Sequence, residues 1–460
     1  MLEGHDVIVF SDDWGRHPFS CQHILRHFMP SNRVLWVNTI GMRLPRFSLY
    51  DMRRAAEKLR SWVVPTSQPG GAGAASAATI PQGLRVISPV MIPFAPLPPV
   101  RAFNRRSVVE AVRRNAREMG FRNPVLLATV PNAADYVGHC GESLVVYYCV
   151  DEFRVWPGMN LPDMVRNLEA HLMRDAHLVV AVSDALARTK GNGRTATRLL
   201  THGVDMAHFA KAAAPQAPPE ELADLHGPVV GFFGLIDSHL DVDIVEHILA
   251  ARPQWNVVLI GTRRIPLTRL ERHARFRWLP AVPYAELPRY ASRFDVAIIP
   301  YVVNEHTCTA NPLKLKEYMA TGKPVVTTPM PEALRYAACL HVAPDGAGFV
   351  QAIERELDVP SDAAPRLAAL DGETWHHKAE LLAAWIEESL VARNATNVVR
   401  RATNPPGNGG AVTPAEVHGG AVGGGIASDC GHHALFGHAR DDTGPVDVAS
   451  ACVRRGGGCS

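Results

Sequence analysis

The sequence predicts an α/β protein with two doubly wound, Rossmann-like domains, one in each half of the chain. Short apolar runs alternate with helix-compatible stretches along residues 6–183, and the same alternation returns along residues 229–343. Such alternation is typical of parallel sheets whose strands are joined by helices. A length of 460 residues also exceeds what one hydrophobic core usually serves, so two domains are expected.

Each half contains six segments with the length and composition of strands. Continuous apolar runs such as residues 145–150 suit strands that helices cover on both faces. The predicted strands are 6–10, 33–38, 84–88, 124–130, 143–150 and 176–183 in the first half, and 229–234, 255–261, 276–279, 296–300, 324–328 and 340–343 in the second.

The segments outside the two strand series differ in composition. Residues 207–226 are rich in alanine, proline and acidic residues, as linkers often are, and residues 373–399 have the pattern of one long helix. Residues 69–78 are an insertion of glycine, alanine and serine, and residues 400–460 are a glycine-rich tail without hydrophobic periodicity, so we expect both to be flexible. The predicted division is 1–206 for the N-terminal domain, 207–226 for the linker, 227–372 for the C-terminal domain, 373–399 for the helix and 400–460 for the tail.

Composition excludes several classes of protein. The chain is 47% hydrophobic and 20% charged with a net charge of +2, as in ordinary globular proteins. No apolar run approaches the ~20 residues of a membrane helix, and the N-terminus lacks the pattern of a secretory signal. The eight cysteines form no C-x-x-C pair, and the D-x-D motif at 241–243 stands at a helix start, where capping is the simpler role. We expect a cytoplasmic protein without a metal or cofactor.

The strand predicted at 296–300 leads into a helix with clear end signals. Asn311 is expected to cap its first turn, Pro312 suits the first helical position, and Gly322 suits the position just past its end. Because ligands bind at the carboxyl ends of strands in open α/β folds, this helix is expected to begin at the ligand site.

Two charged residues share a face of this helix that points away from its apolar stripe. Lys314 and Glu317 lie three residues apart, so their side chains are neighbours. Lys314 and the free N–H groups of the helix start would bind a diphosphate, and the Glu317 carboxylate could accept both hydroxyls of a ribose. The alternative is an ordinary solvated Lys–Glu pair on a capped helix.

Polar residues at the strand ends of the first domain are candidates for a general base. Asp13 and His17 follow the first strand, and Asp151 and Glu152 follow the fifth. Asp151 and Asp13 are the candidates for the base, and His17 and Glu152 are expected to bind substrate. A carboxylate or imidazole in such a place can deprotonate an acceptor hydroxyl, whereas the alternative for Asp13 is helix capping. In the second domain, Arg263 follows the second strand and could add to phosphate binding, the alternative being a surface arginine.

Several motifs together resemble those of a known family. They are N-P-L-K-L-K-E-Y at 311–318 with G-K-P-V-V at 322–326, Y-Y-C-V-D-E-F at 147–153, A-V-S at 181–183, H-G-V-D at 202–205 and G-F-F-G at 231–234. In this order they resemble the landmarks of group 1, or family 4, glycosyltransferases of polysaccharide biosynthesis, which have the two-Rossmann-domain B fold (GT-B). The likeness extends over about residues 6–393.

The resemblance implies a fold and roles for individual residues. The two domains would face a cleft, and the helix at 373–399 would cross back to the first domain. Glu317 would bind the donor ribose, Lys314 would meet the diphosphate, and Gly234 would lie at the donor site. Where the family has a carboxylate that touches the donor sugar, this chain has Thr309. That departure leaves open the contacts of the sugar and whether its anomeric configuration is retained or inverted.

The predicted function is transfer of a sugar from a nucleoside diphosphate sugar to a sugar hydroxyl on a lipid-linked or growing glycan. Lys314 would stabilise the leaving diphosphate, and Asp151 or Asp13 would act as the base. The alternatives are a sugar-nucleotide epimerase, which needs no acceptor, a nicotinamide oxidoreductase, and a non-catalytic sugar-binding protein. No nucleic acid partner is expected.

A basic stretch in the first domain suggests where such an enzyme could meet its acceptor. Residues 101–122 carry apolar residues between their arginines, namely Val108, Val109, Val112, Met119 and Phe121. An amphipathic helix of this kind suits contact with anionic lipid headgroups at the inner face of the cell membrane. The alternative is a helix that packs on the sheet and leaves a solvated basic face.

Overall fold

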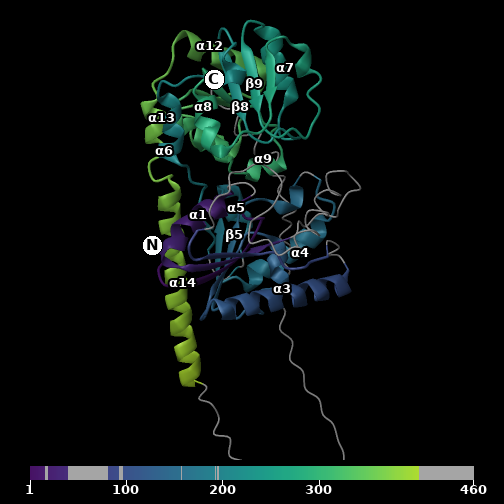
Figure 1. Cartoon of the computed structure of the whole chain (residues 1–460), viewed down its shortest axis with the longest axis vertical. Coiled ribbons are helices and arrows are strands. Elements are labelled where there is room, and N and C mark those ends of the chain that lie inside the picture. The colour runs from purple at the N-terminus through teal and green to yellow at the C-terminus, as the bar shows by residue number, and fades with distance from the viewer. Residues whose placement is uncertain are drawn as a thin grey trace, which may run out of the picture.

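The structure is a computed structural model that describes residues 1–15, 19–39, 81–92, 97–156, 158–191, 193 and 196–403, without the side chains of 397–403. His17, the insertion at 69–78 and the tail beyond 403 lie outside the described residues. Two domains lie one above the other in Figure 1, each built around one parallel sheet. The predicted fold class is confirmed.

The N-terminal sheet has seven parallel strands in the order β3-β2-β1-β4-β5-β6-β7. All six predicted strands are present, and the two-residue β7 is an addition. The strands are β1 (Asp6–Ser11), β2 (Arg33–Asn38), β3 (Leu84–Ile87), β4 (Val125–Ala128), β5 (Leu144–Cys149), β6 (Leu178–Ala181) and β7 (Arg198–Leu199). The helices of this half are α1 (Ser20–Phe28), α3 (Pro98–Glu118), α4 (Pro162–Asp175), α5 (Asp184–Thr189) and α6 (Met206–Phe209).

The C-terminal sheet has six parallel strands in the order β10-β9-β8-β11-β12-β13, and all six were predicted. The strands are β8 (Val229–Phe233), β9 (Asn256–Ile260), β10 (Phe276–Leu279), β11 (Val296–Ile299), β12 (Val325–Thr327) and β13 (His341–Val342). The helices are α7 (Val242–Ala251), α8 (Leu287–Ala291), α9 (Glu305–Thr309), α10 (Leu313–Ala320), α11 (Pro331–Leu334), α12 (Gly346–Asp358) and α13 (Ala364–Ala368). Short 3₁₀ helices are η1 (Met29–Ser31), η2 (Pro131–Asp135), η3 (Phe153–Val155), η4 (Ala210–Ala213), η5 (Glu220–Leu222), η6 (Leu270–Arg272) and η7 (Tyr284–Glu286).

The strand order reverses beside the first strand of each sheet. In the N-terminal sheet β1 lies between β2 and β4, and in the C-terminal sheet β8 lies between β9 and β11. At such a switch point the loops after adjacent strands diverge and leave a crevice at the carboxyl ends. The two reversals therefore locate where each domain can hold a ligand.

The last helix, α14 (Trp375–Thr403), runs along the side of the N-terminal domain in Figure 1. Its residues Trp375, Leu382 and Ile386 are buried in the same apolar cluster as the strands of the first sheet. This is the crossing back to the first domain that the resemblance implies. The helix extends past residue 400, where the tail is predicted to begin.

A buried ion cluster joins the domains where the chain crosses between them. Lys316 is fully buried, and its Nζ donates to the Glu373 carboxylate and to the His202 carbonyl, each at 2.5 Å. Glu373 also pairs with Lys378 at 2.9 Å and accepts from Thr201 Oγ1 at 2.9 Å. Because Lys316 belongs to α10, the cluster fixes this helix to both crossings of the chain.

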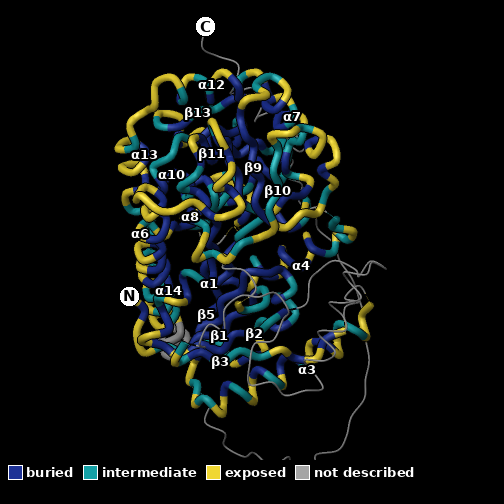
Figure 2. Tube along the Cα trace, turned by 45° about the horizontal axis from the view of Figure 1, so that its top comes forward, coloured by how far each residue is buried: buried dark blue, intermediate teal, exposed yellow. Residues whose placement is uncertain are grey.

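The strands form the interior of both domains, and exposed residues border them (Figure 2). On α3, Val108 and Val112 are fully buried and Val109 is nearly so. These three side chains therefore pack on the sheet, as the alternative interpretation holds, and do not face lipid. Contact of this helix with an anionic membrane stays a prediction. Among the described residues, no helix is long and apolar enough to cross a membrane.

Candidate active site

The candidate site lies at the switch point of the C-terminal sheet, where two glycines follow adjacent strands. Gly234 follows β8 with a φ of +145°, and Gly261 follows β9 with a φ of +150°. A Cβ on Gly234 would lie 2.6 Å from Cε of Lys314, and a Cβ on Gly261 would lie 1.8 Å from the Gly234 carbonyl oxygen. Glycine is needed at both positions, because any side chain would displace Lys314 or the end of β8.

Lys314 reaches this point from the first turn of α10. Its Nζ hydrogen-bonds the Tyr301 hydroxyl, and it lies 4.7 Å from the centre of the Tyr301 ring and 5.1 Å from that of Phe232. The two rings hold the ammonium group by cation–π attraction. Since no carboxylate of the described residues forms an ion pair with Lys314, its charge is available to an anionic ligand.

Glu317 lies one turn further along the same helix. Within the described parts of the chain, no group hydrogen-bonds or pairs with its carboxylate. Burial raises the pKa of Glu317 to about 7, and the positive charge of Lys314 offsets only part of this effect. Hydroxyl groups that donate to this carboxylate would stabilise its ionised form, as two adjacent ribose hydroxyls can do.

The start of α10 differs from the prediction. The helix begins at Leu313, with Pro312 rather than Asn311 at the N-cap and without a side-chain cap. Asn311 instead donates from Nδ2 to the Val182 carbonyl of the other domain at 2.7 Å. The predicted cap is wrong: the other domain holds the amide nitrogen of Asn311, and Oδ1, the atom that a cap would use, accepts no hydrogen bond from the described residues. Gly322 has the predicted place just past the helix, with a φ of +76°.

Thr309 makes a second contact between the domains. Its carbonyl accepts from Ser183 Oγ at 2.6 Å, and its hydroxyl donates to the carbonyls of Glu305 and His306 at 3.2 and 2.9 Å. The side chain is buried and bonded within its own helix. The backbone of Thr309 therefore makes the contact with the N-terminal domain, and its side chain, at the position of the family's carboxylate, is bonded within α9.

A carboxylate and an imidazole meet across the two domains after β5. Nε2 of His306 lies 3.1 Å from Oδ1 of Asp151, and Asp151 also accepts from the Glu152 N–H at 2.8 Å and from Trp156 Nε1 at 2.6 Å. Burial alone would lower the pKa of His306, but the hydrogen bond and charge of Asp151, with the charges of Asp237 and Glu152, raise it above 6.5. Asp151 thus orients the imidazole and favours its protonated form.

A second imidazole and carboxylate pack against the first pair. Nδ1 of His239 lies 2.7 Å from Oδ1 of Asp237, and the ring centres of His239 and His306 are 4.5 Å apart. The His239 ring also lies 6.2 Å from the ring of Tyr301, which holds the lysine of α10. A row of neighbouring side chains therefore connects the predicted donor site to Asp151 of the other domain.

Two predicted binding residues have protein partners elsewhere. Glu152 forms a buried ion pair with Lys190 at 2.8 Å. Arg263 pairs with Glu271 at 2.6 Å, and its guanidinium carbon lies 4.7 Å from the centre of a Trp278 ring. Neither side chain joins the row that leads from the lysine to Asp151.

The remaining predictions concern Asp13, His17 and the D-x-D motif. Asp13 lies just beyond the carboxyl end of β1, where its carbonyl accepts from Gln22 Nε2 at 3.4 Å. His17 lies outside the described residues. Asp241 accepts from the N–H groups of Asp243 and Ile244 at the start of α7, so its predicted capping role is confirmed.

Tyr301, His239 and His306 do not appear among the predicted site residues. Tyr301 and His306 stand in the loop and first turn after β11, and His239 follows β8. Their position after the carboxyl ends of switch-point strands is the signal that could have found them. Their contacts with each other and with Asp151 form only when distant segments come together.

A comparison with protein families identifies the second half of the chain. Residues 227–358, which contain the whole C-terminal sheet, match a family model described as glycosyl transferases group 1. This part of the chain is a group 1 glycosyl transferase domain. The chain is also 28% identical over 175 residues to the putative teichuronic acid biosynthesis glycosyltransferase TuaH of Bacillus subtilis (strain 168). That match covers 36% of this chain and 44% of TuaH, so the chain spans less than half of that relative.

Solved structures share the arrangement of the glycosyl transferase domain and its N-terminal partner. Anabaena Alr3699/HepE in complex with UDP and glucose matches with a TM-score of 0.55 and 14% identity, over 83% of this chain and 99% of HepE. A trehalose-6-phosphate structure from E. coli bound with UDP-2-fluoro glucose matches with a TM-score of 0.56 and 13% identity, over 84% and 99%. These likenesses show the GT-B fold. The predicted resemblance is confirmed.

Proposed function

We propose that the protein transfers a sugar from a nucleoside diphosphate sugar to a hydroxyl of a growing or lipid-linked glycan. The observation that carries the proposal is the pairing of Lys314 and Glu317 on one helix at the switch point. Among the described residues, no carboxylate pairs with the Lys314 ammonium group, and no donor hydrogen-bonds the Glu317 carboxylate. A diphosphate and a ribose have the complementary groups.

The fold neighbours support a donor of this class. HepE is in complex with UDP and glucose, and the E. coli structure is bound with UDP-2-fluoro glucose. A glycan acceptor is supported by the name of TuaH, a putative teichuronic acid biosynthesis glycosyltransferase. Contact with an anionic membrane would bring a lipid-linked acceptor to the enzyme.

In the proposed reaction the acceptor hydroxyl attacks the anomeric carbon of the donor sugar as the bond to the diphosphate breaks. The negative charge passes to the leaving diphosphate, where Lys314 and the start of α10 stabilise it. The row from Lys314 to Asp151 keeps these groups next to the acceptor domain. Closure of the domains would exclude water, which otherwise competes with the acceptor.

We assign the proton transfer to His306 rather than directly to Asp151. Both oxygens of Asp151 already accept hydrogen bonds, from Glu152 and Trp156. Nδ1 of His306 is buried and has no hydrogen-bond partner among the described residues, and Nε2 faces Asp151 at ion-pair distance, so Nδ1 can take a proton once an acceptor hydroxyl reaches it. The neutral imidazole would take the proton of the acceptor hydroxyl, and Asp151 would stabilise the imidazolium that forms. Asp13 stays a predicted alternative base.

Nucleotide titration tests the donor site. UDP and GDP are titrated by calorimetry into the protein and into Glu317→Gln, with Glu220→Gln as the control because Glu220 is an exposed glutamate of η5. We expect Glu317→Gln to weaken binding roughly tenfold, the value of one charged hydrogen bond, and Glu220→Gln to leave it unchanged. Equal affinities for all three proteins would show that the ribose is bound elsewhere.

Turnover without an acceptor separates transfer from epimerisation. A sugar-nucleotide epimerase would convert a UDP-sugar into its epimer with no acceptor present, and proton NMR would show the new anomeric signal. The proposed transferase releases UDP, slowly to water and faster when a glycan acceptor is added. Formation of an epimer with no release of UDP would contradict the proposal.

A further inference from the structure

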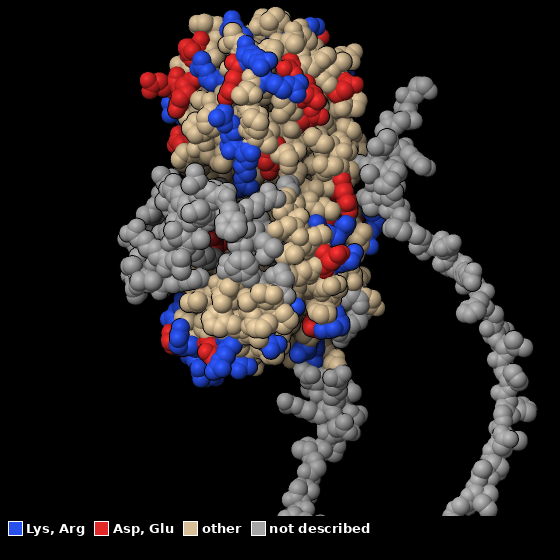
Figure 3. Space-filling view, turned by 90° about the vertical axis from the view of Figure 1, so that its right-hand side faces the viewer, with Lys and Arg blue, Asp and Glu red and all other residues tan. Residues whose placement is uncertain are grey.

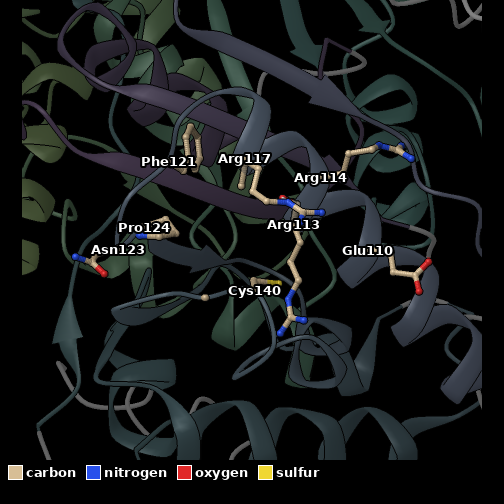
Figure 4. A pocket seen from close by; sticks show the side chains of 10 residues that line it. Glu110, Arg113, Arg114, Arg117, Phe121, Asn123, Pro124 and Cys140 are labelled. Carbon is tan, nitrogen blue, oxygen red and sulfur yellow. The ribbon is translucent and has the colours of Figure 1, made fainter.

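A pocket of about 610 Å³ lies beside the second half of α3 (Figure 4). Its lining combines Arg113, Arg114 and Arg117 of α3 with the segments 121–124 and 140–141, which precede β4 and β5. It therefore opens at the amino ends of these strands, whereas the candidate active site faces their carboxyl ends. Six residues of β5 at ~3.3 Å per residue separate the two edges by roughly 20 Å.

The guanidinium groups around this pocket keep donors free for a ligand. Arg113 Nε donates to the His139 carbonyl at 2.7 Å, and Arg117 Nε donates to the Arg113 carbonyl at 3.2 Å. These bonds fix the side chains and leave their terminal NH₂ groups without a carboxylate from the described residues. The acidic residue of the lining, Glu110, is already paired with Arg106 at 2.9 Å. An excess of unpaired positive charge favours an anion with several oxygens, such as a phosphate.

The same helix carries an exposed apolar group at its other end. Phe103 is 46% exposed, and its spacing of 11 and 14 residues from Arg114 and Arg117 puts all three on one face of α3. Leu97 is 56% exposed at the start of the helix. Their neighbours Val90 and Ile92, 44% and 37% exposed, lie in a segment held to α3 by Ile92 N–H donating to Asn104 and by Ser107 donating to the Val90 carbonyl.

This combination points to a membrane surface. Four of the twelve exposed large apolar side chains in the described parts of the chain fall between residues 90 and 103. Such clustering marks an interaction surface, and arginines further along the helix face that carries Phe103 match the phosphate layer above the acyl chains. Figure 3 shows Lys and Arg side chains gathered at the lower edge of the N-terminal domain, the edge along which α3 lies in Figure 1.

We propose that this α3 surface, defined as Arg113, Arg114 and Arg117 with Val90, Ile92, Leu97 and Phe103, docks on the phosphate headgroups of anionic membrane lipids. The arginine pocket would hold a lipid phosphate, and the apolar group would enter the interface. The inference rests on the membrane contact proposed above but not on the transfer reaction. Binding can therefore be tested without turnover.

Vesicle sedimentation with the full chain tests the surface. Phosphatidylcholine vesicles are compared with vesicles that also contain phosphatidylglycerol. We expect binding to the anionic vesicles alone, and weaker binding as salt rises, because salt screens exposed charges. The triple variant Arg113→Gln/Arg114→Gln/Arg117→Gln should bind them roughly tenfold or more weakly.

A control variant removes the same charge elsewhere. Arg188→Gln/Arg272→Gln/Arg355→Gln changes three exposed arginines on α5, η6 and α12 and should keep full binding. An equal loss of vesicle binding in both triple variants would overturn the assignment, because the net charge of the protein would then explain binding. Absence of vesicle binding by the unchanged protein would also overturn it. Capture of soluble polygalacturonate by the α3 arginines without vesicle binding would identify a glycan surface instead.

UDP titration of the α3 variant keeps the two proposals apart. The variant should bind UDP like the unchanged protein, which also shows that it is folded. If the unchanged protein bound no UDP, the proposed donor site would be contradicted. If vesicle binding were still lost in the α3 variant and kept in the control variant, the membrane surface would remain supported.

Discussion

The donor side and the acceptor side of the candidate site are built in different ways. On the C-terminal side, the groups proposed to bind the donor come from a single helix and one glycine, since Lys314 and Glu317 share α10 and Gly234 makes room for the lysine. On the acceptor side, the proposed base is His306 of α9, and it is oriented only because Asp151 of the N-terminal domain meets it. The donor side is organised by local sequence and the acceptor side by a tertiary contact.

This difference separates binding from chemistry. A site on one helix keeps its geometry when the domains move apart, whereas a pair that spans the cleft is complete only when they are together. Nucleotide should therefore bind in either arrangement, and proton transfer should require the closed one. Substitutions on the two sides are expected to change different quantities.

The largest effect is expected for the pair between the domains. His306→Gln removes the proposed base and should lower the rate of UDP release from a UDP-sugar by roughly 10²–10⁴-fold, with UDP affinity unchanged. Asp151→Asn should slow the reaction less. Because Asp151 raises the pKa of His306, its loss should also shift the rise of the rate with pH to lower pH. Steady-state rates between pH 5 and 9 with calorimetric UDP titration provide the test.

His247→Gln is the control for this prediction, since His247 lies on α7 away from the row of polar residues. A His306→Gln protein with normal turnover would remove the imidazole from the mechanism and return Asp13 or Asp151 to consideration. If His306→Gln lost both UDP affinity and turnover, nucleotide binding and proton transfer would not depend on separate groups.

The same contrast explains which features the sequence could predict. The strands followed from apolar runs, and the positions of Lys314 and Glu317 followed from helical spacing, because both depend on neighbours in the chain. The meeting of Asp151 with His306 depends on how two domains pack, which no local pattern contains. Asn311 shows that local sequence can mislead even within one segment. Its residue type suits a helix cap, but its side-chain amide donates to the Val182 carbonyl of the other domain.

A second prediction concerns the cluster that fixes α10 to the chain crossings. Lys316→Met leaves the buried Glu373 with fewer charge partners and should lower the free energy of unfolding by about 3 kcal/mol. Urea unfolding followed by fluorescence measures this change. The control is Lys323→Met, which removes a less buried lysine whose Nζ, among the described residues, bonds only the Ser292 carbonyl. Equal stability of the Lys316 variant would show that Lys378 alone satisfies Glu373.

A smaller effect is expected at Gly234, whose missing side chain leaves room for Lys314. Gly234→Ala adds a Cβ against Lys314 and should weaken UDP binding roughly tenfold, because the ammonium group is displaced from the diphosphate. Gly138→Ala is the matched control: its φ is also positive, at +81°, but no atom lies within 4 Å of the added carbon. It should lose stability without losing UDP affinity. Unchanged affinity in Gly234→Ala would show that Lys314 does not need this position.

The smallest effect concerns the decrease in the free energy of unfolding that results from burying the Glu317 carboxylate at the site. Its pKa is raised from 4.5 in the unfolded chain to about 7 in the folded protein, so the native state binds the proton more tightly. The native state is therefore penalised as pH rises from about 4.5 to about 7, and the full penalty persists above that range.

Glu317→Gln removes this charge and keeps the shape of the side chain. We expect it to raise the free energy of unfolding at pH 8 by about 1 kcal/mol, a discounted value because part of the residue remains in solvent. The gain should shrink as pH falls toward 5. Urea unfolding at pH 5, 6.5 and 8 measures it, with Glu220→Gln as the exposed control. UDP-glucose affinity should move in the opposite sense, rising as Glu317 ionises and showing no such rise in Glu317→Gln. A variant that is no more stable at pH 8 would mean that the carboxylate is already satisfied in the free protein, and the ribose would then gain little by binding there.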